Sequence, residues 1–148
     1  MEPSGEVTGL LIGEYQHSVD AKGRMNFPVK LRDDLGDSFI ITKGLDNCLF
    51  VYPMSEWLLL EERTNALPLS KSRQLKRFLF AGAAEVEPDK QGRVLIPQNL
   101  RDYAGLKNEV VVVGVSNRAE IWDKARWEES NLDLTSESIA DAMDELGF

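Results

Sequence analysis

Short runs of hydrophobic residues alternate with glycine and proline along this chain, and the pattern predicts short strands and short helices. Residues 11–19 and 24–27 read as two strands around a tight turn, and residues 39–42 and 48–53 read as two more. Between the two pairs lies a helix that begins after Pro28 and ends on Gly36, because proline favours the first turn of a helix and glycine its C-cap. The segment therefore predicts a β-β-α-β-β unit.

This unit occurs twice. The segments DAKGRMNFPVKLRD, from Asp20, and DKQGRVLIPQNLRD, from Asp89, are identical at seven positions at an offset of 69. The second copy places strands at residues 81–88, 93–96, 109–114 and 119–123, and its helix ends on Gly105. A unit this short buries little surface alone, so we expect the two copies to pair about a pseudo-two-fold axis. The predicted fold class is α+β, mostly β with short helices, as one barrel-like domain.

The remaining segments are helical or acidic. We expect an N-terminal tail over residues 1–9, a first repeat over 10–54, a helical linker over 55–80, a second repeat over 81–125 and an acidic helical tail over 126–148. In the linker, Ser55 is the predicted N-cap of the first helix. Leu67 and Pro68 break the helical pattern, and Ser70 starts the second helix.

The charge is unevenly distributed. The net charge of −8 argues at first against nucleic-acid binding. From residue 123 onward, however, there are eight acids and only two bases, and residues 10–122 hold fifteen of each. An acidic tail can therefore make the net charge negative even when another part of the surface is basic. The net charge alone neither supports nor excludes nucleic-acid binding.

Few residues suit catalysis or metal binding. The chain has one cysteine, Cys48, within an apolar run, and one histidine, His17, within a predicted strand. We expect a buried thiol, no disulfide and no metal site. Phosphate-binding glycine loops and nucleophile motifs are missing, and no apolar run is long enough for a signal peptide or a membrane span. We therefore expect that the protein is not an enzyme and has no catalytic residues. We also expect no cofactor, no small-molecule substrate and no membrane partner.

The repeated D-x-x-x-R turn carries the candidate chemistry. The candidate DNA-binding residues are four in each turn, namely Asp20, Lys22, Gly23 and Arg24, and Asp89, Lys90, Gly92 and Arg93. Each aspartate could simply stabilise its own turn by pairing with the arginine. Equally, it could orient an arginine whose planar fork is presented to phosphate or guanine. Arg32 and Arg101 also repeat, and we interpret them first as salt-bridge partners on surface helices, with DNA contact as the alternative.

The chain resembles the MraZ family of bacterial regulators through EYQHSVDAKGRMNFPVKLRD, RFLFAGAAEVEPDKQGRVLIP and EVVVVGVSNRAEIW, a resemblance that covers Ile12 to Trp127. It implies an AbrB-like swapped-hairpin fold and DNA contact by the two D-x-x-x-R turns. It further implies a cytoplasmic, nucleoid-associated transcription factor that forms homo-oligomeric rings, often octameric. Such a ring would bind direct repeats of double-stranded DNA in the promoter of the division and cell-wall gene cluster and repress it. The alternative hypothesis is a structural or protein-interaction ring whose D-x-x-x-R turns only shape hairpins.

Overall fold

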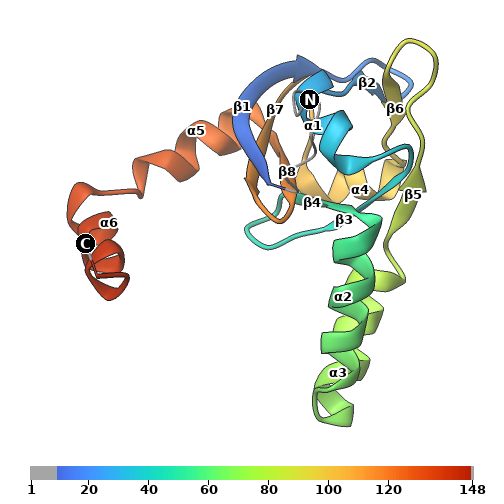
Figure 1. Cartoon of the computed structure of the whole chain (residues 1–148). Coiled ribbons are helices and arrows are strands. Elements are labelled where there is room, and N and C mark those ends of the chain that lie inside the picture. The colour runs from blue at the N-terminus through green and yellow to red at the C-terminus, as the bar shows by residue number, and fades with distance from the viewer. Residues whose placement is uncertain (1–9, 148) are drawn as a thin grey trace, which may run out of the picture.

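Two antiparallel sheets form the body of the protein in the computed structural model, which describes residues 10–147 (Figure 1). The first repeat contains β1 (Leu11–Ser18), β2 (Arg24–Asn26), α1 (Val29–Leu35), β3 (Phe39–Lys43) and β4 (Leu49–Pro53). The second contains β5 (Ala84–Val86), β6 (Arg93–Leu95), α4 (Gln98–Ala104), β7 (Glu109–Ser116) and β8 (Ala119–Asp123). The predicted β-β-α-β-β unit is thus present twice, and the α+β class is confirmed. The expected N-terminal tail lies outside the described residues.

The two repeats exchange their first strands. The six-stranded sheet runs β1-β7-β8-β4-β3-β5, so β1 pairs with a strand of the second repeat and β5 with a strand of the first. Strands β2 and β6 pair with each other in a separate two-stranded ribbon. Replacing each strand by its equivalent in the other repeat reverses the strand order and leaves every pairing unchanged. The sheet therefore has the pseudo-two-fold symmetry that the sequence repeat predicts, and the repeats interlock.

One large hydrophobic cluster of the described residues lies where the two sheets and the two short helices meet, and a second contains Trp57, Leu79 and Trp122. Alternate residues of a strand face opposite sides, and β2 and β6 turn Met25 and Val94 inward, each with 1% of its surface exposed. Leu31 of α1 and Leu100 of α4 pack into the same cluster. Burial of such side chains provides the main driving force for folding. The ribbon is thereby fixed to the body through one face, and its other face is left outward.

The helix ends differ in part from the predictions. Gly36 and Gly105 follow α1 and α4 with φ of 92° and 62°, as expected of glycine caps. The first linker helix, α2 (Met54–Asn65), has Pro53 rather than Ser55 at its N-cap, because the chain leaves β4 in an extended conformation at Pro53 and turns helical at once. For the same reason Pro68 precedes α3 (Leu69–Leu75), which begins one residue before Ser70.

The second linker helix is not regular throughout. After α3 the chain forms a π-helical turn, η1 (Lys76–Phe80), and the strand predicted from residue 81 begins only at Ala84. The Thr42 hydroxyl of β3 donates a hydrogen bond to the Leu79 carbonyl at 2.6 Å, and the Ala81 amide closes the wide turn on the Lys76 carbonyl. Figure 1 shows α2 and α3 as a hairpin that projects from the side of the body remote from β2.

A helical arm follows the second repeat. Helix α5 (Lys124–Leu132) leaves β8 and is followed by α6 (Ser136–Glu145), which stands away from the body in Figure 1. All residues of α6 are exposed. Thr135 and Ser138 form a capping box at its start. Within residues 10–147, none of the helices is both long and apolar enough to cross a membrane.

Candidate nucleic-acid interface

The first D-x-x-x-R turn is organised by one carboxylate. Oδ1 of Asp20 accepts hydrogen bonds from the backbone amides of Lys22 and Arg24, both at 2.9 Å, and Oδ2 accepts one from Nε of Arg24 at 3.3 Å. The backbone closes the same turn, because the Gly23 amide donates to the Asp20 carbonyl. Gly23 has a φ of 86°, a conformation that glycine adopts without strain. The aspartate and the arginine of the motif are therefore four residues apart because that is the distance that this turn spans.

The second turn repeats this geometry. Asp89 accepts from the amides of Gln91 and Arg93 at 2.9 and 2.8 Å, and from Nε of Arg93 at 2.9 Å. Gly92 has a φ of 79°. The backbone hydrogen bond from the arginine, more than any other interaction, lowers the pKa of each aspartate below its ordinary value. Both aspartates therefore stay ionised at neutral pH and keep their arginines oriented.

Each pairing uses only one edge of the guanidinium group. The bonds to the carboxylates are made by Nε of Arg24 and of Arg93. Within residues 10–147, the two Nη atoms of each group form no hydrogen bond or ion pair with the protein. About a third of each arginine side chain is exposed. A guanidinium group with two open Nη atoms can form paired hydrogen bonds with a phosphate or with guanine O6 and N7.

The two arginines emerge on one face of the β2–β6 ribbon. The register pairs Arg24 with Leu95 and Asn26 with Arg93. Because Arg93 lies two residues from the partner of Arg24, the two arginines are diagonal neighbours, with their backbones about 7–8 Å apart. On the opposite face of the ribbon, Met25 packs in the hydrophobic core. The ribbon therefore presents both arginines outward together.

The predicted lysines accompany these turns. Lys22 and Lys90 are both exposed, and each precedes the glycine of its turn. No ion pair holds either side chain within the described residues 10–147. The structure thus brings the eight predicted site residues onto one ribbon and the two turns that lead into it.

Arg32 and Arg101 take a different place from the one expected. No carboxylate lies within 4.0 Å of either guanidinium group in the part of the chain that the structure describes, so their interpretation as salt-bridge partners is wrong. Instead, each crosses to the turn of the other repeat. A Cβ atom placed on Gly23 would meet Arg101 at 2.7 Å, and one placed on Gly92 would meet Arg32 at 2.8 Å.

This crossing follows from the exchanged strands. The Ile96 amide donates to the Gly23 carbonyl at 2.8 Å, and Nε of Arg101 donates to the Ile96 carbonyl at 2.9 Å. On the other side the Phe27 amide donates to the Gly92 carbonyl. The sequence shows that Arg32 and Arg101 are equivalent, but no feature of the pattern tells which turn each one reaches.

The residues considered for other chemistry do not form a reactive cluster. Cys48 is 1% exposed, and burial raises the pKa of its thiol far above the ordinary value. His17 is half-buried in β1, and burial lowers its pKa. No group of three or more potential metal ligands gathers anywhere in residues 10–147.

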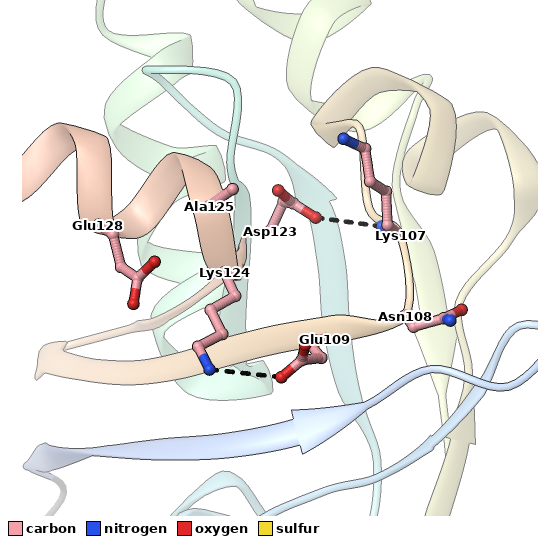
Figure 2. Close-up of a pocket in the computed structure, with 7 residues that line it drawn as sticks. All are labelled: Lys107, Asn108, Glu109, Asp123, Lys124, Ala125 and Glu128. Atoms are coloured by element: carbon pink, nitrogen blue, oxygen red, sulfur yellow. Dashed lines mark hydrogen bonds and ion pairs between the residues drawn. The ribbon is translucent and has the colours of Figure 1, made fainter.

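A polar recess beside α5 contains an ion pair and a carboxylate that is bound to a backbone amide. In Figure 2 the Asp123 carboxylate accepts a hydrogen bond from the Lys107 backbone amide at 3.2 Å, and the Lys124 ammonium bonds the Glu109 carboxylate at 3.3 Å. The Glu128 side chain lies at the margin of the same recess. These contacts join the start of α5 to β7, and we assign the recess a structural role.

Comparison with known proteins agrees with the repeat. The family model described as "MraZ protein, putative antitoxin-like" matches the chain twice, over residues 10–77 and 79–146. The second match extends beyond Trp127, so the resemblance to this family includes the C-terminal arm, contrary to the expectation from the sequence.

Curated relatives cover almost the whole chain. A protein of Acetivibrio thermocellus is 57% identical over 143 residues, which are 94% of this chain and 100% of the relative. Proteins of Caldicellulosiruptor saccharolyticus and Clostridium beijerinckii are 55% and 53% identical with the same coverage of both chains. All three are named "Transcriptional regulator MraZ", which is the name of a regulator and not of an enzyme. With its two D-x-x-x-R turns on one swapped-hairpin body, the chain belongs to the MraZ family.

Proposed function

We propose that this protein is a transcriptional regulator that binds double-stranded DNA through its two D-x-x-x-R turns. The observation that carries the proposal is the pair of arginines on one exposed ribbon, each held by an aspartate through Nε with its Nη atoms open. The major groove of B-DNA admits a two-stranded β-ribbon, and arginine is the most frequent reader of guanine there. Lys22 and Lys90 add positive charge on either side, where phosphates would lie.

The negative net charge of the chain does not argue against DNA binding. The excess of acids lies from residue 123 onward, in a region that forms α5 and α6 and that projects away from the ribbon in Figure 1. Charges separated by more than about 10 Å are largely screened at moderate ionic strength. The ribbon therefore acts on DNA through its local positive charge.

The finer part of the proposal concerns assembly and target. We infer a homo-oligomeric ring, octameric as in the family that the chain resembles, acting in the cytoplasm on the nucleoid. Its target is promoter direct repeats before its own division and cell-wall gene cluster, which it represses. A ring presents many ribbons at fixed spacing, and tandem sites would then be bound with an avidity far above that of one ribbon.

The test is a gel shift with DNA from upstream of the protein's own gene, run across a series of salt concentrations. Arg24→Ala should weaken promoter binding by about 5- to 150-fold, because one good bidentate contact contributes ~1–3 kcal/mol. Its oligomer mass and melting temperature should stay unchanged, since Asp20 keeps its backbone hydrogen bonds. The matched control is Arg63→Ala, at an exposed position on α2 remote from the ribbon. An Arg24→Ala protein that still shifts the fragment with full affinity would refute the proposal.

The alternative is a structural or protein-interaction ring in which the turns only shape hairpins. The close fit of each aspartate to its own turn favours it. In that case Asp20→Ala should lower stability, and no promoter fragment should bind tightly at physiological salt. A steep fall of affinity with salt, together with a preference for the promoter sequence, distinguishes the regulator.

A further inference from the structure

The outward face of the β2–β6 ribbon carries four side chains, and only two of them belong to the D-x-x-x-R motif. The other two are Asn26, which follows Arg24 by two residues in β2, and Leu95, which follows Arg93 by two in β6. Both are exposed, Leu95 to 55%. Residues two apart in a strand share a face, so Asn26 and Leu95 point the same way as the arginines.

The register arranges these side chains as a two-by-two array. Arg24 lies opposite Leu95, and Asn26 lies opposite Arg93. The array measures about 5 Å across the strands and about 7 Å along them, which is small enough to enter a major groove about 12 Å wide. When the arginines on one diagonal reach base edges, the residues on the other diagonal lie over neighbouring bases.

The chemistry of the second diagonal is suited to bases. The asparagine amide can pair with N6 and N7 of adenine, and an aliphatic side chain can contact the C5-methyl group of thymine. Neither residue carries charge, so neither contributes to general attraction to phosphate. We propose that Asn26 and Leu95 are specificity-determining residues, with Asn26 reading adenine and Leu95 reading a thymine methyl group. This inference rests on the proposed function, and it adds the sequence preference of the same ribbon.

The proposal also gives the binding site a direction. The aspartate, glycine and arginine of the two turns are identical in the two repeats, and their geometry obeys the pseudo-two-fold axis. A two-fold symmetric ribbon reads an inverted repeat, because the symmetry of the site mirrors that of the protein. Asn26 and Leu95 occupy equivalent positions, and they break this symmetry at the readout face. One subunit therefore reads an oriented element, and successive subunits in a ring read it in the same orientation.

The experiment is selection of bound sequences from a randomised pool of double-stranded DNA with the full-length protein. The wild type should select an oriented element. Leu95→Asn makes the two strands equivalent, so the selected element should become more nearly an inverted repeat and gain an adenine in place of the thymine. Asn26→Leu should lose the adenine preference and bind the wild-type element about 5- to 150-fold more weakly.

The controls separate readout from folding and from general DNA binding. Neither substitution changes charge, so the dependence of affinity on salt should keep the wild-type slope. Leu69→Asn, the same change at a position of α3 that is 77% exposed, should select the wild-type element. Oligomer mass and melting temperature are measured for each variant to show that it folds and assembles. Leu95→Asn tests the thymine contact, and Asn26→Leu tests the adenine contact.

The outcomes distinguish the inference from the proposed function. If the wild type selects a sequence but Leu95→Asn and Asn26→Leu select the same one, the readout assignment is wrong and the regulator proposal stands. If either variant selects the wild-type sequence with a shallower salt slope, its effect is on phosphate contact, which also overturns the assignment. If the wild type enriches no sequence at all, the proposed function fails together with the inference.

Discussion

At the scale of single residues, the glycine of each D-x-x-x-R turn meets two requirements at once. Gly23 adopts a φ of 86°, and its missing side chain leaves room for the guanidinium group of Arg101. Three atoms of that group lie between 2.7 and 2.8 Å from the place where a Cβ atom would stand. Such nearly equal distances indicate that the flat face of the guanidinium covers the glycine. The turn is thus shaped by its own aspartate and packed by the other repeat.

Gly23→Ala should destabilise the protein more than Gly36→Ala. Both glycines have a positive φ, and an L-residue in such a conformation costs on the order of 1–3 kcal/mol. A Cβ atom on Gly36 would meet nothing within 4 Å, so the Gly36 variant should lose stability only through backbone strain. The Gly23 variant must also displace Arg101. Urea unfolding of both variants measures the difference, and equal losses of unfolding free energy would show that the Arg101 packing contributes nothing.

At the scale of elements, the π-helical turn η1 depends on a strand that is distant in sequence. Its Leu79 carbonyl accepts the hydrogen bond of Thr42, a residue of β3 that is fully buried. The wide turn also lets Phe80 pack on Trp57 of α2, with ring centroids 4.4 Å apart. One hydroxyl group therefore helps to set how the α2–α3 hairpin joins the body.

Thr42→Val should lower the free energy of unfolding by about 1–3 kcal/mol, because it keeps the shape of the side chain and leaves a buried carbonyl without its partner. Thr42→Ser keeps the hydroxyl group and should retain more of the stability than the valine variant. Chemical denaturation of the three proteins provides the measurement. A valine variant as stable as the wild type would mean that the Leu79 carbonyl is satisfied in another way.

The sequence predicts most of the strands and helices, but it does not predict which strands pair with one another. Alternation and the positions of Pro28 and Gly36 predict the repeated unit, because these signals act within a few residues. They do not show that β1 pairs with β7, since alternation determines which face of a strand is buried and not which strand lies beside it. The position of Arg101 under Gly23 depends on that exchange, and the π-helical turn depends on Thr42, so neither could be predicted locally.

In the candidate site, too, the local features could be predicted from the sequence and the pairing of the strands could not. The aspartate, glycine and arginine of each turn are predicted from the repeat, because the motif is a local geometry that each turn completes by itself. Lys22 and Lys90 lie at different positions of the two turns, so the repeat does not predict them. Asn26 and Leu95 were not identified, because they differ between the repeats and a search for identity passes over them. Their shared face with the arginines became evident only from the register of β2 against β6.

At the scale of the whole molecule, the C-terminal arm has an apolar face that the single chain leaves uncovered. Ile139, Met143 and Leu146 follow one another at helical spacing on α6 and its end, and they are 45%, 42% and 78% exposed. The spacing is that of an amphipathic helix that packs against a partner surface. We expect a neighbouring subunit of the proposed ring to cover this face of α6.

Ile139→Asp should therefore lower the oligomer mass, measured by sedimentation or light scattering, because it places a charge within the covered face. Ala140→Asp is the matched control, since it adds the same charge about 100° around the helix. The fold of the body, measured by circular dichroism, should be retained in both, because α6 packs on no other part of the chain through buried residues. Equal oligomer masses for the two variants would show that the apolar face of α6 has no role in assembly.

The exchange of β1 and β5 has a consequence for the protein while it is being made. Synthesis proceeds from the N-terminus, and domains fold as their sequence emerges from the ribosome. The carbonyl of Gly23 receives its hydrogen bond from Ile96, and β1 finds its neighbour only in β7. The first turn can form by itself, but it gains its contacts with the second repeat only after β6 and the residues that follow it have been translated. A chain that ends before β6 lacks the β2–β6 ribbon, so we expect such a chain not to bind a promoter.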